Sequence, residues 1–171
     1  MNSLYLLRHA KSSWDDPGLA DHDRPLAPRG RKAAQRMALY LRKAKIRPQL
    51  VLCSSAARAV QTYDAISTAL DGPVVVSVED DLYGASDAGL LARLHEVADT
   101  VRAVLVVGHN PGLQDLALGL ADDGNATEVA RLGDKFPTCA LANLDVPTTW
   151  DALGPGHAHL KLLVLPRDLP S

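Results

Sequence analysis

The chain has few cysteines, no long apolar run and no strong excess of charge of either sign. Its two cysteines, Cys53 and Cys139, lie in separate apolar segments without a CxxC spacing. That pattern excludes a disulfide framework and a zinc ribbon, and it predicts two buried thiols. No segment approaches the roughly 20 apolar residues needed to span a bilayer, and the N-terminal apolar run is too short for a signal peptide. We therefore expect a cytoplasmic protein without a membrane partner.

The charge balance limits the kinds of partner that the protein can have. Eighteen lysines and arginines stand against 20 aspartates and glutamates, a formal net charge of -2. A general positive field, which holds many proteins to nucleic acid, is absent, so no nucleic-acid partner is expected. Hydrophobic residues make up 47% and charged residues 22% of the 171 residues. These proportions predict one folded domain, 1–171, with a sizeable core.

Short apolar runs alternate with segments of helical periodicity. Strands are predicted over 4–7, 50–53, 74–78, 103–107, 140–146 and 160–165. Helices are predicted over 29–45, 88–98 and 111–120, and from candidate N-caps Ser54 and Ser55 to Leu70. The segment from Lys11 to Pro28 contains several prolines and indicates a loop. This alternation predicts an α/β fold, a three-layer sandwich around a mostly parallel central sheet.

Polar side chains suited to phosphate chemistry follow three of the predicted strands. Arg8-His9 ends the first, the segment from Ser54 to Arg58 follows the second, and His109-Asn110 follows the fourth. Because the carboxyl ends of parallel strands line one crevice, we expect these segments to meet there. Arginine binds phosphate oxygens with two parallel hydrogen bonds, and histidine is a potential nucleophile. The pattern therefore predicts a phosphate site.

These segments also resemble a known family. Leu7-Arg8-His9-Ala10, Ser54-x-x-x-Arg58-Ala59-x-Gln61-Thr62 and Val107-Gly108-His109-Asn110 resemble motifs of the histidine phosphatase superfamily. Within it, the short chain and the segment Asp21-x-x-Arg24-Pro25-Leu26 are most similar to the SixA-like phosphohistidine phosphatases. The resemblance runs from about Leu4 to Leu113 and implies a phosphoglycerate mutase-like fold.

The resemblance also implies roles for individual residues. His9 would attack phosphorus and be transiently phosphorylated, while Arg8, Arg58 and His109 surround the phosphoryl oxygens. Arg24 would be a further phosphate contact, with Asp21 at the rim. The remaining expected substrate-binding residues are Asn110 and Ser54. No cofactor is expected, and no metal, because arginines supply the charge and no ligand cluster with metal spacing is visible.

Two departures from the family pattern affect the prediction. Ala10 replaces the usual glycine, which requires a negative φ at that position. The glutamate that mutase-like relatives use as general acid has no clear counterpart; Glu79, Asp80 and Asp81 are candidates by position, and Asp21 is the only family-matched carboxylate. Without an acid, a protonated phosphoramidate leaves more readily than an alkoxide, which favours phosphohistidine as substrate.

We therefore predict a phosphatase that hydrolyses phosphohistidine on proteins through a phosphohistidine enzyme intermediate. A general phosphatase for small phosphate esters and a non-catalytic phosphate-binding regulatory domain are the alternatives. The short loop from Lys11 to Pro28 indicates an uncapped site, which admits a protein surface and small molecules alike. Trp14, in that loop, either borders the crevice or covers an apolar patch.

Overall fold

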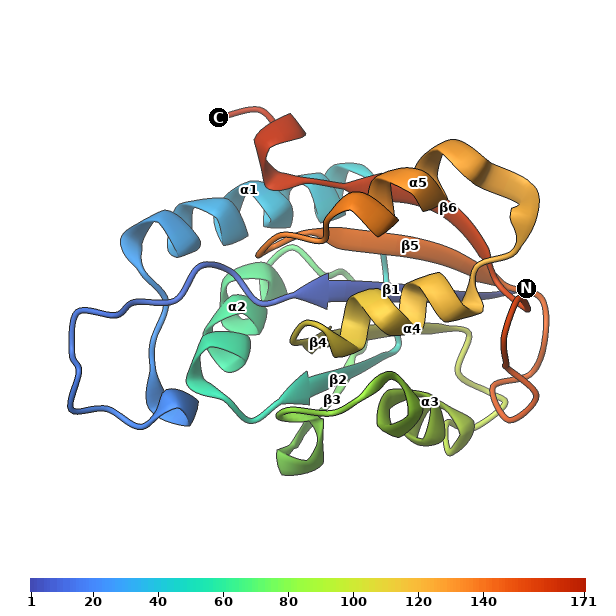
Figure 1. The fold of residues 1–171 in the computed structure, drawn as a ribbon, viewed down its shortest axis with the longest axis horizontal. Coiled ribbons are helices and arrows are strands. Elements are labelled where there is room, and N and C mark those ends of the chain that lie inside the picture. The colour runs from blue at the N-terminus through green and yellow to red at the C-terminus, as the bar shows by residue number, and fades with distance from the viewer.

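The computed structural model describes residues 1–171 and contains a six-stranded sheet with helices on both faces (Figure 1). The strands are β1 Asn2–Arg8, β2 Leu50–Ser54, β3 Val75–Glu79, β4 Ala103–Gly108, β5 Leu141–Val146 and β6 His159–Val164. Their order is β3-β2-β4-β1-β5-β6. The first four run parallel, and β5 and β6 are added antiparallel to their neighbours. The prediction of a mostly parallel central sheet is confirmed.

The helices form the two outer layers of the sandwich. They are α1 Pro28–Lys43, α2 Ala57–Ser67, α3 Asp87–His95, α4 Gly112–Leu120 and α5 Ala126–Asp134. α1 and α2 pack together in one hydrophobic cluster, whereas α3, α4 and α5 belong to the other. The sheet lies between the two clusters, as the predicted three-layer sandwich requires.

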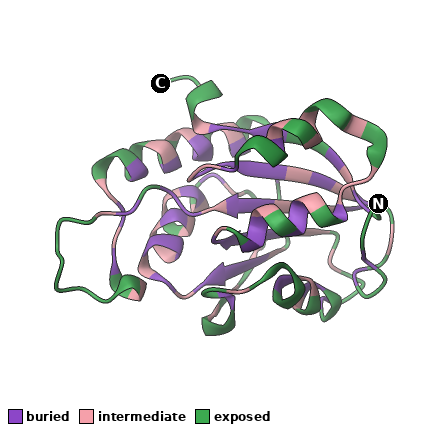
Figure 2. Cartoon of the chain, in the orientation of Figure 1, coloured by how far each residue is buried: buried purple, intermediate pink, exposed green.

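Strand β1 shows why the apolar runs predict a sheet buried on both faces. Successive side chains of a strand point to opposite faces. Leu4 and Leu6 belong to the cluster around α3, α4 and α5, and Leu7 belongs to the cluster around α1 and α2. Figure 2 shows the resulting purple centre of the sheet between partly exposed helices. The edge strand β3 differs, since Val75 is 67% exposed.

One local prediction was wrong, and one short helix was not predicted. Ala56, not Ser54 or Ser55, is the N-cap of α2, and no side chain caps that helix. The short helix α5 was missed, although Ala126, Val129 and Ala130 recur at helical spacing and Val129 packs against the core beside the buried Leu132. A second local signal is the N-cap Asn125, whose side chain accepts a hydrogen bond from the backbone N–H of Glu128.

One prediction from the composition has a direct counterpart in the structure. Cys53 and Cys139 are free and buried, which confirms the prediction of two buried thiols. None of the helices combines the length and the apolar character that crossing a membrane requires.

Candidate active site

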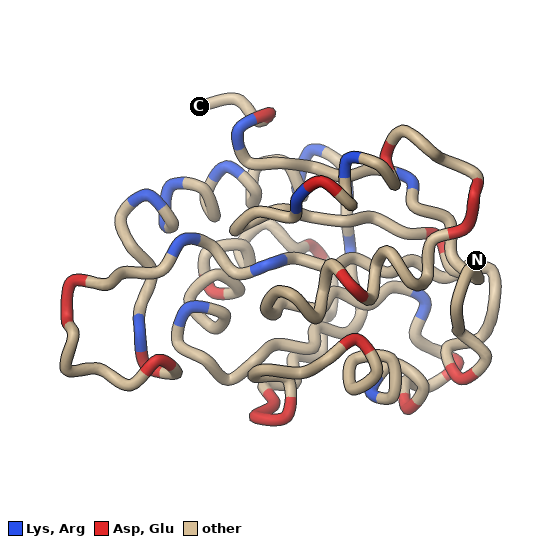
Figure 3. Tube along the Cα trace, viewed as in Figure 1, with Lys and Arg blue, Asp and Glu red and all other residues tan.

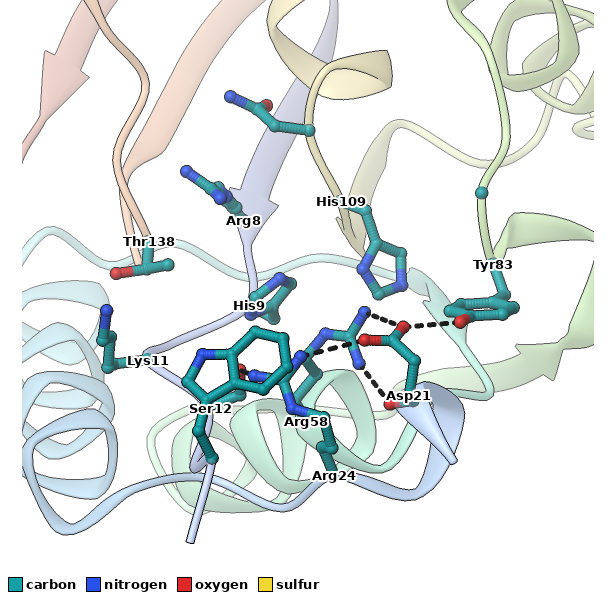
Figure 4. Close-up of a pocket in the computed structure, with 13 residues that line it drawn as sticks. Arg8, His9, Lys11, Ser12, Asp21, Arg24, Arg58, Tyr83, His109 and Thr138 are labelled. Atoms are coloured by element: carbon teal, nitrogen blue, oxygen red, sulfur yellow. Dashed lines mark hydrogen bonds and ion pairs between the residues drawn. The ribbon is translucent and has the colours of Figure 1, made fainter. Parts of the chain in front are cut away.

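The carboxyl ends of β1 and β4, the start of α2 and the turn after β3 enclose a pocket of about 460 Å³ (Figure 4). Arg8, His9, Arg58 and His109, which are far apart in the sequence, all line it. The polar loop after β1 closes one side and brings in Arg24 and Asp21. The full lining is Arg8, His9, Lys11, Ser12, Trp14, Asp21, Arg24, Arg58, Tyr83, Gly84, His109, Asn110 and Thr138.

His9 is held in one tautomer and one charge state. Its Nδ1 lies 2.7 Å from the backbone oxygen of Ala10. A carbonyl oxygen only accepts, so Nδ1 carries the proton and Nε2 keeps a free lone pair. Burial, assisted by His109, Arg58 and Arg8, lowers the pKa of His9 to about 3, against the opposing effect of the Ala10 hydrogen bond. The side chain is therefore a neutral imidazole, the form that can act as a nucleophile.

The backbone around His9 is braced from two sides. The N–H of Ala10 donates to Thr62 Oγ1 at 2.9 Å, and that hydroxyl donates to the backbone oxygen of Arg58 at 2.7 Å. The N–H of Cys139 donates to the backbone oxygens of both Arg8 and His9. Cys139 adopts a φ of 62, whereas Ala10 is not among the residues with positive φ. The condition predicted for an alanine at position 10 is thus confirmed.

His109 faces His9 across the pocket, with the two ring centroids 5.1 Å apart. Its Nε2 lies 2.7 Å from Ser54 Oγ, which also accepts the N–H of Ala56. Ser54 is fully buried, and its hydroxyl has no other acceptor within hydrogen-bond distance. We therefore assign the hydroxyl hydrogen to Nε2 and the proton of the neutral ring to Nδ1. Burial, followed by the charge of Arg58, lowers the pKa of His109 to about 4. His109 is thus a neutral hydrogen-bond donor.

Two expected binding residues support the pocket rather than offering free polar groups to it. Ser54 is fully buried and does not line the pocket, so it acts on the site through its hydrogen bond to His109. Asn110 does line the pocket, but its amide nitrogen donates to Gln114 Oε1 and to the backbone oxygen of Phe136, both at 3.1 Å. Both amide hydrogens are used, which makes Asn110 a brace between loops.

Asp21 holds two of the arginines in position. Arg58 donates from Nη1 to the Asp21 backbone oxygen at 2.7 Å and from Nη2 to Oδ2 at 3.0 Å. Arg24 Nη1 donates to Asp21 Oδ1 at 2.9 Å. Each guanidinium retains further N–H groups, since Arg has five donors in a fixed plane. The third arginine, Arg8, donates from Nη1 to the Phe136 backbone oxygen at 3.0 Å. Two arginines thus hold the Asp21 carboxylate, and the third is held by the backbone of Phe136.

The charge state of Asp21 decides what this carboxyl group can do. Hydrogen bonds from Tyr83, first, and then from Arg58 and Arg24 hold its pKa well below the usual range. Asp21 is therefore an anion at neutral pH. Of the other candidate acids, Glu79 pairs with Arg93 at 2.8 Å, and neither it nor Asp80 nor Asp81 lines the pocket. The candidates chosen by position alone thus lie outside the site.

Comparison with known proteins gives the family. The model of the histidine phosphatase superfamily (branch 1) matches residues 4–84. The uncharacterized protein Rv1276c of Mycobacterium tuberculosis is 42% identical over 163 residues, which cover 94% of this chain and 100% of that protein. The chain belongs to the histidine phosphatase superfamily. This membership supports hydrolysis of a phosphate group as the general activity.

Solved structures resemble this histidine phosphatase over nearly its whole length. A protein from Agrobacterium tumefaciens, described as a candidate phosphohistidine phosphatase SixA, is 32% identical with a TM-score of 0.81, covering 96% of this chain and 97% of that one. Its counterpart from Nakamurella multipartitia is 30% identical with a TM-score of 0.85, covering 96% of both chains. Phosphohistidine phosphatase SixA of Escherichia coli is 29% identical over 110 residues, 63% of this chain and 67% of that protein. The expected SixA-like, phosphoglycerate mutase-like fold is confirmed.

Sequence reasoning missed several pocket residues of this histidine phosphatase. Tyr83 donates its hydroxyl hydrogen to Asp21 Oδ2 at 2.6 Å; the signal that could have found it is its place just after the third strand, at the carboxyl edge of the sheet. Lys11 and Thr138 line the pocket and were not predicted. Trp14 borders the crevice, because its ring centre lies 3.2 Å from the Arg24 guanidinium carbon.

The histidines outside the pocket have protein partners. His157 lies 3.1 Å from the Ala152 backbone oxygen, and His159 lies 3.1 Å from Asp122. No group of three or more His, Cys, Asp or Glu side chains is arranged to hold a metal ion. The cationic side chains that line the pocket are Arg8, Lys11, Arg24 and Arg58.

The two pocket histidines predict an acid-sensitive stability. Both pKa values lie below the ordinary 6.5, so the unfolded chain binds two protons that the folded protein does not as pH falls from about 6.5 toward 4. The free energy of unfolding is expected to decrease through this window. In ¹⁵N NMR at pH 5, His9 should remain a neutral ring with its proton on Nδ1. A His9 titration centred near 6.5 would contradict this assignment.

Proposed function

We propose that this histidine phosphatase hydrolyses phosphohistidine on proteins, with His9 as the nucleophile. The observation that carries the proposal is the state of Asp21. It is the only carboxyl group lining the pocket, and its hydrogen bonds to two arginines and Tyr83 keep it ionised. An alkoxide leaving group needs a proton from an acid, whereas an imidazole leaves readily once its own ring is protonated. A pocket without a protonated carboxyl group therefore suits phosphohistidine.

The first chemical step follows from the geometry of His9. Its Nε2 lone pair attacks phosphorus, the bond between phosphorus and the substrate imidazole breaks, and that imidazole departs with the bonding electrons and the proton on its other nitrogen. Phosphorylated His9 keeps its Nδ1 proton and becomes cationic. The Ala10 backbone oxygen, 2.7 Å from Nδ1, stabilises that charge.

The second step returns the enzyme to its starting state. Water attacks phosphorus, the bond to His9 Nε2 breaks, and inorganic phosphate leaves while the water proton passes to phosphate or solvent. In both steps Arg8, Arg24 and Arg58 and the Nδ1–H of His109 stabilise charge on the phosphoryl oxygens. Positioning and electrostatics supply most of the catalysis in phosphoryl transfer, which makes these preorganised donors sufficient without a metal.

Relatives support this substrate class. The Escherichia coli relative at 29% identity is a phosphohistidine phosphatase by name. Other proteins with this fold include a candidate alpha-ribazole-5'-P phosphatase from Escherichia coli at 20% identity and a TM-score of 0.69, a likeness that extends to the fold alone. Hydrolysis of small phosphate esters is therefore the alternative against which phosphohistidine is tested.

Substrate selectivity is the direct test. We expect kcat/KM for a phosphohistidine protein to be at least about tenfold higher than for phosphoserine peptides or sugar phosphates, a difference of about 1.4 kcal/mol in transition-state stabilisation. The measurement is phosphate release from the three substrates under identical conditions. Preference for a small ester would replace phosphohistidine with a small-molecule substrate. Phosphate binding without turnover would instead indicate a regulatory domain.

Substitution of Asp21 separates an orienting role from an acid role. Asp21→Asn should lower kcat/KM roughly tenfold, because it weakens charge-assisted hydrogen bonds worth about 1.5 kcal/mol. The loss should be the same for phosphohistidine and phosphoserine substrates, since a residue that aims arginines acts on both. Tyr83→Phe should act in the same direction with a smaller effect. Asp23→Asn, which changes a neighbouring carboxylate that does not line the pocket, is the control. A loss confined to the ester would identify Asp21 as a proton donor.

A further inference from the structure

The basic residues of this chain are concentrated on one element. Between Arg24 and Tyr63 the sequence holds more than half of the 18 lysines and arginines but no aspartate or glutamate. Most of them lie on α1, where Figure 3 shows blue segments and no red ones. The whole chain has a formal net charge of -2. The positive charge of α1 is therefore a local feature that needs a local explanation.

Four of these cations and one leucine form a stripe along the outer face of α1. Successive members, from Arg29 to Lys43, lie three, four, three and four residues apart in the sequence, which places them on one side of a helix. The opposite side is buried against the sheet and includes Ala34, Met37 and Leu41. We call the outer set the basic stripe; it consists of Arg29, Lys32, Arg36, Leu39 and Lys43.

The protein itself does not explain the cations of the basic stripe. None of the four pairs with a carboxylate of the chain. Arg29 lies in the first turn of α1, which contains no acidic residue. Cations near a helix N-terminus oppose the helix dipole and lower helix stability. Lys43, in the last turn, favours the helix dipole, but none of the four cations has an internal ion pair, and Arg29 opposes the dipole. Negative charge on a partner would compensate these cations.

An apolar groove runs beside the stripe. A cavity of about 450 Å³ lies between α1 and the segment after β6, and its wall contains the apolar side chains of Leu39, Tyr40 and Leu169 together with Arg36 and Lys43. Leu39 is 62% exposed. Cations at helical spacing beside an apolar groove are complementary to a helix that carries carboxylates and an apolar residue on one face.

The basic stripe begins beside the candidate active site. Lys11 lines the pocket, and its backbone oxygen accepts the N–H of Ala27 at 2.9 Å, immediately before α1. Gly30, in the first turn of α1, packs so closely on the Lys11 backbone that a side chain there would clash with it. From Arg29 to Lys43 the stripe extends about 20 Å at the rise of an α-helix. A small molecule in the pocket cannot contact it, whereas a protein substrate can.

From these observations we propose that the basic stripe docks an acidic amphipathic helix of the phosphoprotein whose phosphohistidine enters the pocket; this inference rests on the proposed function. A membrane is a poorer fit, because the apolar side of α1 is buried in the core and cannot insert into lipid. Nucleic acid is also a poorer fit, because a phosphate backbone binds through charge and would leave the apolar groove unfilled.

Two synthetic peptides and one small substrate test the docking surface. Both peptides carry the same phosphohistidine and a helical segment; one segment has glutamates at the stripe's spacing and a leucine between them, and the other has glutamines in place of the glutamates. Phosphoimidazole is the small substrate. We expect wild-type kcat/KM to be at least tenfold higher for the acidic peptide than for the glutamine peptide, through a lower KM.

Charge-reversal variants locate the effect. Lys32→Glu combined with Arg36→Glu should abolish the preference for the acidic peptide and leave phosphoimidazole hydrolysis unchanged. The matched control is Arg31→Glu combined with Lys45→Glu, which makes the same change in charge at exposed positions outside the stripe and should retain the preference. Equal losses in the two double variants, or no wild-type preference, would overturn the docking surface.

Direct binding keeps this test independent of turnover. The anisotropy of the labelled acidic peptide without its phosphoryl group should report binding to wild type and to the control variant, but not to Lys32→Glu/Arg36→Glu. Stripe-dependent binding to phosphatidylserine vesicles in preference to the peptide would overturn the protein partner in favour of a membrane. If wild type hydrolyses neither phosphoimidazole nor the phosphopeptides, the proposed function fails, while the anisotropy result still decides the docking surface.

Discussion

His9→Ala is expected to abolish both turnover and the phosphoryl-enzyme intermediate. The ring at position 9 is the only histidine in the pocket whose Nδ1 is fixed by a backbone carbonyl, so that Nε2 presents a free lone pair. The Nε2 of the other pocket histidine, His109, is occupied by the hydroxyl of Ser54. Rapid quench with radiolabelled substrate should trap an acid-labile, base-stable phosphoryl group on the wild type and none on the variant.

Two controls make this result specific. His157→Ala alters an exposed histidine outside the pocket and should retain both labelling and turnover. The His9→Ala protein should still bind inorganic phosphate, because Arg8, Arg24 and Arg58 remain, and phosphate binding would show that the pocket has folded. Label that persists in the His9→Ala protein would assign the nucleophile to another residue.

His109→Ala is expected to lower kcat by about 10²–10³-fold, the loss typical of removing one preorganised donor to a developing negative charge. The structure places a neutral His109 ring opposite His9 with its proton on Nδ1. Its removal leaves phosphoryl charge less stabilised in the transition state. Single-turnover kinetics should show the loss in the phosphorylation step itself. An unchanged rate would remove His109 from the chemistry.

Ser54→Ala provides the matched comparison for His109. It keeps the imidazole but removes the hydroxyl that donates to Nε2, so the ring is free to place its proton on either nitrogen. We expect a loss of roughly tenfold, the scale of one hydrogen bond of about 1.4 kcal/mol. A Ser54→Ala loss equal to that of His109→Ala would mean that the tautomer, rather than the ring, carries the whole effect.

The position of polar residues directly after apolar strands correctly predicted the central residues of the site, because the fold of a parallel sheet determines where the strands end. Arg8, His9 and His109 each follow an apolar run, and parallel strands bring their carboxyl ends to one edge. The same reasoning did not predict the role of Ser54 correctly. Its position suggested a cap or a phosphate contact, and only packing against His109 turned its hydroxyl away from the pocket.

The sequence by itself determined the positions of the strands along the chain, the polar residues at their ends and the family, because apolar periodicity and short motifs are local properties of the chain. Only the tertiary structure decided the state of the carboxyl group in the pocket. Tyr83 and Asp21 are 62 positions apart, and Arg58 reaches Asp21 across 37. The pKa of Asp21 depends on those distant donors, since hydrogen bonds and charges act through space rather than along the chain.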